Sequence, residues 1–228
     1  HTPPPPPPPP RLNCRRQRQM CIRDRPWRIP EPSDLPDISV PNHTDPETFH
    51  PYDRDPDTLA RPWAVPGSPG MEHRVGGLES LDVLGTVSYD PDNHQRMTDL
   101  RQRKVAGIAD DIADLEVFGP ETGDLLILGW GSTFGTLRTA AERLQRSGLS
   151  VAHAQLRHLN PFPQNTGEVL ASYKRVLIPE INTGQLRLLI RGRYLVDAVG
   201  LNRVRGKPLP VPEVMRAAKL LLDEEEVR

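Results

Sequence analysis

The strongest constraint on the fold is a regular alternation of apolar runs and amphipathic stretches in the second half of the chain. Leu125–Leu128 is a short, continuous apolar run, as expected for a strand covered on both faces of a parallel sheet. The alternation favours a three-layer α/β fold with a largely parallel sheet. We expect strands at 125–128, 150–156, 175–179 and 197–204, and helices at 133–146, 166–173, 183–194 and 212–225.

Capping residues indicate where two of these helices begin and end. Asn165, followed three residues later by Glu168, resembles a capping box and predicts a helix that starts at Thr166. Gly148 is expected to close the helix that ends at Arg146.

The first 120 residues have a different composition, and they contain most of the 27 prolines in the chain. Residues that precede proline are pushed away from helix, so we expect 26–69 to be extended and irregular. Widely spaced aromatic side chains suggest that this segment wraps a larger body, because a free linker would have little use for them. These side chains are Trp27, Phe49, Tyr52 and Trp63.

One helix is predicted within this region. Asp90 is a suitable N-cap ahead of Pro91, and the helix should run to about Asp111. Its apolar residues form one narrow stripe, consisting of Met97, Leu100, Ile108 and Ile112. We therefore expect 26–120 to be extended apart from a helix near 91–111, and 121–228 to form the α/β domain.

Residues 1–25 differ from the rest of the chain. Pro3–Pro10 is a run of prolines typical of a solvated polyproline II rod, and a stretch rich in Arg and Gln follows it. Met20–Arg25 is also what ATG-TGT-ATA-AGA-GAC-AG encodes, which is a transposon-end adapter used in DNA library preparation. We interpret 1–25 as an adapter artefact; the alternative is a disordered arm that binds an SH3-type domain or nucleic acid.

Charge and composition argue against several classes of function. A net charge of -1 and a pI near 6.7 give no overall attraction to nucleic acid or anionic lipid. No window approaches the roughly 18 consecutive apolar residues of a membrane span, and no secretion signal is visible, so we expect a cytoplasmic protein. Cys14 and Cys21 both lie in the unusual first tract, so no disulfide, cysteine-held metal or iron–sulfur cluster is expected in the folded part.

The glycine loop at 129–135 lies between a strand and a helix, where a dinucleotide would bind. Its pattern, G-x-G-x-x-x-G, differs from the dinucleotide fingerprint by one residue, and the next strand does not end in an acidic residue. We interpret these glycines as permitting a tight turn, with NAD or FAD binding as the alternative. Ser132 lacks the flanking glycines of a nucleophile elbow, and His153 and His158 have no acid placed to orient them. No His, Asp or Glu cluster has metal-ligand spacing.

No complete catalytic site is predicted, but three loops carry polar side chains suited to a ligand or a partner. Two follow the second and third strands at the carboxyl edge of the sheet, where ligands or partners dock in open α/β folds. The third is a glycine-rich loop at 67–79. The candidate residues are Glu72, His73, Arg74, Arg157, His158, Asn160, Glu180, Asn182 and Gln185. The alternative is a structural role, in which Phe162 fills the core and Asn182 or Thr183 caps the next helix.

Several ordered motifs resemble the α subunit of 2-oxoglutarate:ferredoxin oxidoreductase. In the α/β domain they are residues 128–133 (LGWGST), 156–163 (LRHLNPFP) and 179–186 (PEINTGQL). Upstream motifs are similar to the stretch that follows the pyrimidine-binding domain of that family: 61–67 (RPWAVPG), 70–74 (GMEHR), 76–79 (GGLE) and 89–94 (YDPDNH). The resemblance covers about residues 26–222.

The resemblance implies a thiamine-diphosphate enzyme that decarboxylates a 2-oxoacid, passes electrons through an iron–sulfur centre to ferredoxin, and forms an acyl-CoA. It implies that 121–228 is similar to the transketolase C-terminal module, known in this family as core domain II, which supports subunit packing. It also implies that 26–120 is the extended tail of the pyrimidine-binding domain.

In the family, the groups that hold the pyrimidine ring and the substrate carboxylate lie upstream of this segment. The diphosphate, magnesium and cluster belong to the β subunit. We therefore expect a C-terminal fragment that binds no cofactor by itself, is inactive alone, and has the β subunit as its partner, with ferredoxin and CoA at the level of the complex. The alternative is a free-standing α/β nucleotide-binding or protein-interaction module.

Overall fold

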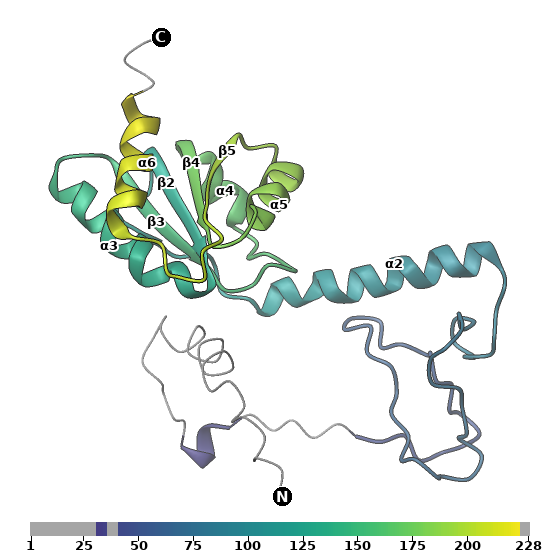
Figure 1. The fold of residues 1–228 in the computed structure, drawn as a ribbon. Helices are drawn as coiled ribbons and strands as arrows, with labels where there is room; N and C mark the ends of the chain where they lie inside the picture. The colour runs from purple at the N-terminus through teal and green to yellow at the C-terminus, as the bar shows by residue number, and fades with distance from the viewer. Residues whose placement is uncertain (1–30, 36–40, 224–228) are drawn as a thin grey trace, which may run out of the picture. The chain divides into compact units, whose positions relative to one another are not determined.

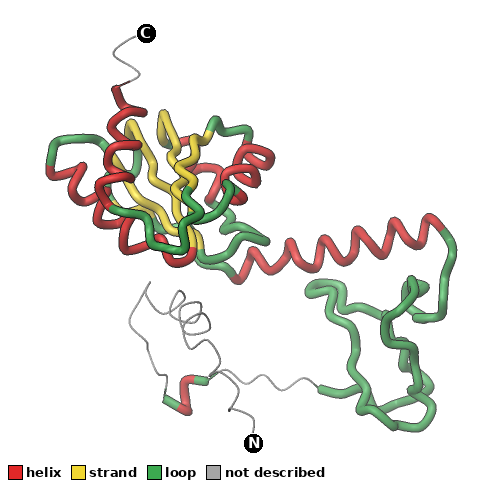
Figure 2. Tube along the Cα trace, viewed as in Figure 1, coloured by secondary structure: helices red, strands yellow, loops and turns green. Residues whose placement is uncertain are grey.

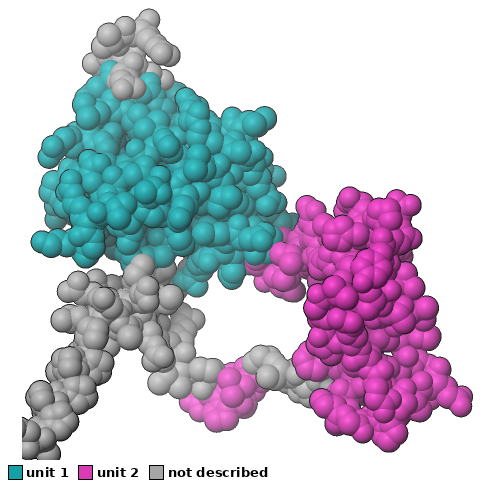
Figure 3. Space-filling view, turned by 45° about the vertical axis from the view of Figure 1, so that its right-hand side comes forward, with its two compact units in different colours: residues 1–29, 113–228 teal, residues 30–112 magenta. Residues whose placement is uncertain are grey.

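The computed structural model describes residues 31–35 and 41–223, and all strands of its sheet follow residue 112 (Figures 1 and 2). The chain divides into two compact units, one of residues 30–112 and the other including 113–223 (Figure 3). None of the described helices is long and apolar enough to cross a lipid bilayer. The interpretations of residues 1–25 and of Trp27 lie outside the described residues.

In the unit 30–112, helix α2 (Pro91–Gly107) is the main regular element, and the 3-10 turn η2 (Ile108–Asp111) continues it. The predicted cap is confirmed, because the Asp90 side chain accepts a hydrogen bond from the backbone N–H of Asp92 at 2.8 Å. The predicted apolar stripe is wrong in part. Met97 is 1% exposed, but Ile108 remains 49% exposed, so the buried residues of the helix lie in its first two turns.

The chain before α2 is irregular, as the prolines predicted. Apart from the short 3-10 turn η1 (Pro32–Asp34), described residues 31–35 and 41–90 form turns, bends and isolated bridges and no helix or extended strand (Figure 2). Two acidic residues of this segment form ion pairs with α2. Asp82 accepts from Arg96 at 2.6 Å, and Glu79 accepts from both terminal nitrogens of Arg101 at 3.1 and 3.2 Å. Asp82 also accepts from Arg54 of its own segment at 2.7 Å.

The second unit contains a five-stranded sheet with the order β1-β3-β2-β4-β5. Strands β2 (Gly123–Trp130), β3 (Val151–Leu156), β4 (Tyr173–Glu180) and β5 (Ala198–Asn202) are parallel, as expected from the strand–helix alternation. The sequence did not indicate β1 (Val117–Phe118), a two-residue edge strand that pairs antiparallel with β3.

Helices cover both faces of the sheet and produce the predicted three layers (Figure 1). Helices α3 (Phe134–Arg146) and α6 (Val211–Asp223) pack on one face against side chains such as Leu125 and Ile127. Helices α4 (Thr166–Ala171) and α5 (Gln185–Tyr194) pack on the other, against Leu126 and Leu128. Residues 125–128 are fully buried, because consecutive side chains of one strand enter the two cores alternately.

The predicted capping box at the start of α4 is wrong. Asn165 makes no side-chain cap; its amide instead accepts from the Leu115 N–H at 2.8 Å and donates to the Leu115 carbonyl at 3.1 Å. The helix is also shorter than predicted, because Tyr173 begins β4 and donates its hydroxyl to the Pro120 carbonyl at 2.6 Å. At Asn165 the hydrogen bonds to Leu115, which is distant in sequence, therefore take the place of the local capping box that the sequence pattern predicted. The predicted end of the last helix, at residue 225, lies outside the described residues.

Candidate functional site

The glycine loop after β2 is explained by packing. A β-carbon added at Gly129 would lie 2.4 Å from Leu137 Cδ1 and 2.6 Å from Gln155 Oε1, so a larger residue would have to displace these side chains between the strand and α3. Gly131 has φ +59° and begins a single 3-10 turn, η3 (Gly131–Thr133), that leads into α3. These contacts support the tight-turn interpretation of the glycines over the nucleotide-loop interpretation.

Glu180, at the carboxyl end of β4, is the most highly bonded of the candidate residues. Its side chain is fully buried, and its Oε1 accepts hydrogen bonds from Trp130 Nε1 at 3.2 Å and Asn182 Nδ2 at 3.0 Å. The first turn of α5 supplies two more donors, the backbone N–H of Leu186 to Oε1 at 2.9 Å and of Arg187 to Oε2 at 3.2 Å. The carboxylate thus lies at the positive end of the α5 dipole and joins β2, β4 and α5.

Asn182 and Gly184 shape the turn between β4 and α5. The Asn182 carbonyl oxygen Oδ1 accepts from the backbone N–H of Gly184 at 2.7 Å and of Gln185 at 3.1 Å. Gly184 has φ +99°, a left-handed conformation that favours glycine. Asn182 therefore has the structural capping role that the sequence left open, whereas the Gln185 side chain is exposed.

The remaining candidates are dispersed. Arg157, His158 and Asn160 follow β3 and are exposed, and the first two line the cavity described below. Glu72, His73 and Arg74 belong to the other unit, where His73 Nδ1 lies 2.9 Å from the Met71 carbonyl and Arg74 donates to the Gly76 carbonyl at 3.2 Å. The structure thus brings together Glu180, Asn182 and Gln185, while each of the other two groups lies in its own loop.

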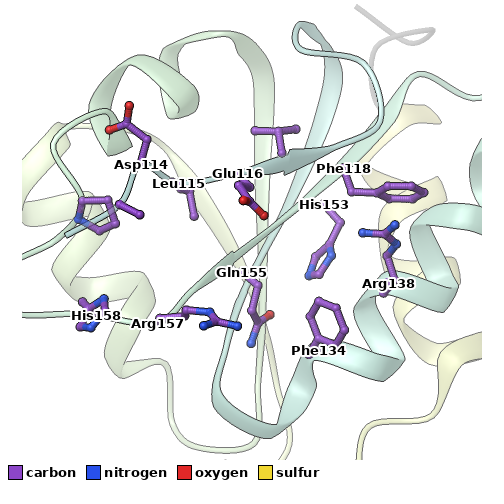
Figure 4. A pocket seen from close by; sticks show the side chains of 13 residues that line it. Asp114, Leu115, Glu116, Phe118, Phe134, Arg138, His153, Gln155, Arg157 and His158 are labelled. Atoms are coloured by element: carbon purple, nitrogen blue, oxygen red, sulfur yellow. The ribbon is translucent and has the colours of Figure 1, made fainter. Parts of the chain in front are cut away.

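A cavity of about 640 Å³ lies between β3, α3 and the segment that leads into β1 (Figure 4). His153 and Gln155 project into it from alternate positions of β3, beside Phe134 and Arg138 of α3 (Figure 4). Its lining comprises Ala113, Asp114, Leu115, Glu116, Val117, Phe118, Phe134, Arg138, His153, Gln155, Arg157, His158 and Pro163.

Buried polar atoms form the floor of this cavity. His153 is 2% exposed, and burial lowers its pKa to about 4, so the imidazole is neutral at pH 7. His153 Nε2 and Gln155 Oε1 are both buried and have no hydrogen-bond partner in the part of the chain that the structure describes. Gln155 Nε2 donates to the Gly131 carbonyl at 3.0 Å, which ties the cavity to the loop after β2.

Sequence reasoning treated His153 as a lone histidine and did not identify this cavity. One signal was present: His153 and Gln155 alternate along the strand predicted at 150–156, and Arg157 follows it at the same spacing, so an extended chain places all three on one side. The contribution of Arg138 had no such signal, because its guanidinium reaches the site by stacking 3.1 Å above the Phe118 ring centroid, across the edge of the sheet.

Two features of the described residues bear on the metal and the diphosphate that the resemblance implies. Across residues 31–35 and 41–223, no group of three or more His, Cys, Asp or Glu side chains could hold a metal ion. A diphosphate at the N-terminus of α5 would compete with Glu180 for the N–H groups of Leu186 and Arg187. Glu180 therefore already accepts the hydrogen bonds that a diphosphate would need at this edge of the sheet.

Comparisons with known proteins agree with the fold. Residues 123–198 match the sequence model of pyruvate:ferredoxin oxidoreductase core domain II. The chain is 49% identical over 199 residues to the 2-oxoglutarate oxidoreductase subunit KorA of Mycobacterium tuberculosis, a match that covers 86% of this chain and 30% of that protein. It is 31% identical over 160 residues to the α subunit of 2-oxoacid:ferredoxin oxidoreductase 2 of Aeropyrum pernix, covering 68% of this chain and 25% of the relative.

A solved structure of 2-oxoglutarate:ferredoxin oxidoreductase from Magnetococcus marinus, with 2-oxoglutarate, coenzyme A and succinyl-CoA bound, superposes with a TM-score of 0.75 and 31% identity. The match covers 84% of this chain and 34% of that one. The chain thus spans between 25% and 34% of the length of these three relatives. The resemblance seen in the sequence motifs is confirmed, and the chain is related over most of its length to the α subunits of 2-oxoacid:ferredoxin oxidoreductases.

Proposed function

We propose that this chain is part of the α subunit of a 2-oxoacid:ferredoxin oxidoreductase that acts on 2-oxoglutarate. The observation that carries the proposal is the 49% identity, over 199 residues, to a mycobacterial 2-oxoglutarate oxidoreductase subunit. The complex would convert 2-oxoglutarate and CoA to succinyl-CoA and carbon dioxide, and would pass two electrons to ferredoxin. Thiamine diphosphate, magnesium and an iron–sulfur cluster would be bound elsewhere in the complex, which we place in the cytoplasm.

Within that complex, residues 121–228 have a packing role and 26–120 form the extended tail of the neighbouring domain. The geometry of Glu180 supports this assignment, because its four hydrogen bonds all go to groups of the same domain. A buried carboxylate held in this way is a structural anchor for α5. Polar loop residues that remain exposed, such as Arg157, His158, Asn160 and Gln185, are proposed interface residues, as are Glu72, His73 and Arg74.

The experiment is purification through an affinity tag on this chain in its source organism. The purified complex should reduce a viologen dye when both 2-oxoglutarate and CoA are present, while the chain produced alone should show no activity. Pyruvate and a branched-chain 2-oxoacid, tested in parallel, would report substrate choice. Purified material without any CoA-dependent oxidation of a 2-oxoacid would refute the proposal, and faster oxidation of pyruvate than of 2-oxoglutarate would refute the substrate assignment.

A further inference from the structure

The cavity between β3, α3 and the segment before β1 is not used by the packing role proposed above. Its volume of about 640 Å³ lies within the range of pockets that hold a small molecule. Its lining includes the apolar side chains of Leu115, Val117 and Phe134, together with the imidazole of His153. An apolar cavity with a few convergent polar groups is the usual form of a ligand site.

His153 supplies the observation that points to a ligand. Its side chain is almost fully buried and projects into the cavity (Figure 4), yet its Nε2 atom has no hydrogen-bond partner among the described residues. Gln155 Oε1, on the same side of β3, is unpartnered in the same way. Buried polar atoms in proteins are nearly always hydrogen-bonded. A buried imidazole nitrogen left open beside a cavity therefore indicates a group that the cavity receives.

Arg138 places a positive charge beside His153. Its guanidinium stacks on Phe118, which is the register partner of His153 on β1, and its Nε donates to Glu142 at 3.2 Å. The terminal nitrogens of this guanidinium make no hydrogen bond to a described residue. Burial is the main reason that the pKa of His153 is low, and the nearby charge of Arg138 lowers that pKa further. A neutral imidazole that donates from Nε2, next to a guanidinium, is suited to a carboxylate.

The other charged side chains of the lining limit the charge that a ligand can carry. Asp114 lies at the opposite end of the cavity from Arg138 (Figure 4). The lining has two guanidinium groups, of Arg138 and Arg157, and two carboxylates, of Asp114 and Glu116, so it has no excess of positive charge. A ligand with several negative charges, such as a nucleotide, would gain little there. The balance favours a singly charged ligand whose remaining part is apolar.

We propose that this cavity binds a small, singly charged organic acid. The carboxylate accepts hydrogen bonds from Nε2–H of His153 and from Arg138, and the apolar part of the ligand lies against Leu115 and Phe134. The inference goes beyond the proposed function, because a packing role requires no ligand. It also does not depend on the identity of the complex, so either proposal can fail without the other.

Calorimetric titration of this chain with benzoate and with benzamide tests the proposal. The two probes have nearly the same shape, but only benzoate carries a negative charge. Benzoate should bind with a Kd of about 1 mM or lower, and the Kd of benzamide should be at least about tenfold higher. Binding of neither probe, or equal affinity for both, would overturn the inference.

Three variants locate the bound probe. His153→Phe, which keeps a ring but removes the donor, and Arg138→Gln should each raise the Kd of benzoate at least about tenfold. Arg146→Gln is the matched control, because Arg146 is an exposed arginine of the same helix that does not line the cavity, and it should leave the Kd unchanged. Thermal unfolding checks that each variant is folded. Equal benzoate affinity in all variants would place the probe at another site and refute the assignment.

NMR of the His153 imidazole in the original chain gives a second readout that needs no variant. A bound carboxylate favours the charged imidazole, so saturating benzoate should raise the pKa of His153 from about 4, whereas benzamide should not. An unchanged pKa with benzoate bound would exclude the contact. The purified complex should bind benzoate as the chain does. Binding by the chain but not by the complex would show that another part of the complex fills the cavity, and would overturn the assignment to a small molecule.

Discussion

Replacing Glu180 with glutamine changes one buried atom from an acceptor to a donor. Oε1 of Glu180 accepts from Trp130, Asn182 and the Leu186 N–H, and Oε2 accepts only from the Arg187 N–H at 3.2 Å. A glutamine with its oxygen at the Oε1 position retains the first three bonds. Its NH₂ group then faces the N–H of Arg187, which loses its partner.

The expected cost follows from these contacts. A hydrogen bond to a charged acceptor contributes about 1.5–3 kcal/mol, and loss of the charge also weakens the three bonds that remain. Removing a buried charge recovers part of its desolvation cost. We therefore expect Glu180→Gln to lower the free energy of unfolding by about 2 kcal/mol, and Glu180→Ala, which leaves all four donors without this acceptor, by about 4 kcal/mol.

Urea unfolding followed by far-ultraviolet circular dichroism measures both changes. With a slope of about 2 kcal/mol/M, the midpoint for Glu180→Gln should fall by about 1 M. Glu168→Gln is the matched control, because Glu168 is an exposed residue of α4, and its midpoint should stay within about 0.25 M of the original chain. A Glu180→Gln chain that unfolds at the original midpoint would refute the view that this carboxylate anchors α5 to the sheet.

Three further predictions concern other contacts. Hydrogen bonding from Arg101 lowers the pKa of Glu79 to about 2, so the stabilisation from this pair is complete above pH 4.5 and is lost as the pH falls toward 2. In the Arg101→Met variant the pKa of Glu79, measured by NMR of its carboxyl carbon, should therefore rise. An unchanged pKa of Glu79 would contradict the assignment. Because burial lowers the pKa of His153 from 6.5 to about 4, the unfolded chain binds more protons in that interval, and stability should fall by roughly 3 kcal/mol between pH 6.5 and 4. In His153→Phe the urea midpoint should therefore fall less between pH 6.5 and 4 than it does in the original chain. An equal fall in the two proteins would exclude a contribution from His153. Asn165→Asp should lower stability by about 1–3 kcal/mol because a carboxylate faces the Leu115 carbonyl, and an unchanged melting temperature would rule out the amide bridge.

The regular part of the fold was predictable because its signals are local. The buried run at 125–128, the cap at Asp90 and the helix end at Gly148 each depend on residues close in sequence. Strand β1 had no such signal. Two residues are too few for a periodic pattern, and Val117–Phe118 become a strand only by pairing with β3 more than 30 residues later.

The roles of candidate site residues were harder to predict because their partners are distant. The local pattern at Asn165 favoured a capping box, yet its amide is bound by Leu115, 50 residues earlier in the chain. Glu180 was correctly located at a strand end, but one of its hydrogen-bond donors is Trp130, also 50 residues away. A residue pattern indicates which side chains can bond, and the tertiary structure decides which acceptor each donor reaches.

The position of Glu180 bears on how this domain contributes to a complex. In open α/β folds the carboxyl edge of the sheet binds ligands because helix N-termini there present free N–H groups. At α5 a side chain of β4 already occupies those groups, so the helix is held rigidly against the sheet and its first turn is unavailable to a phosphate. A helix whose first turn is closed by a buried side chain of its own domain supports a packing role for this edge over a catalytic one.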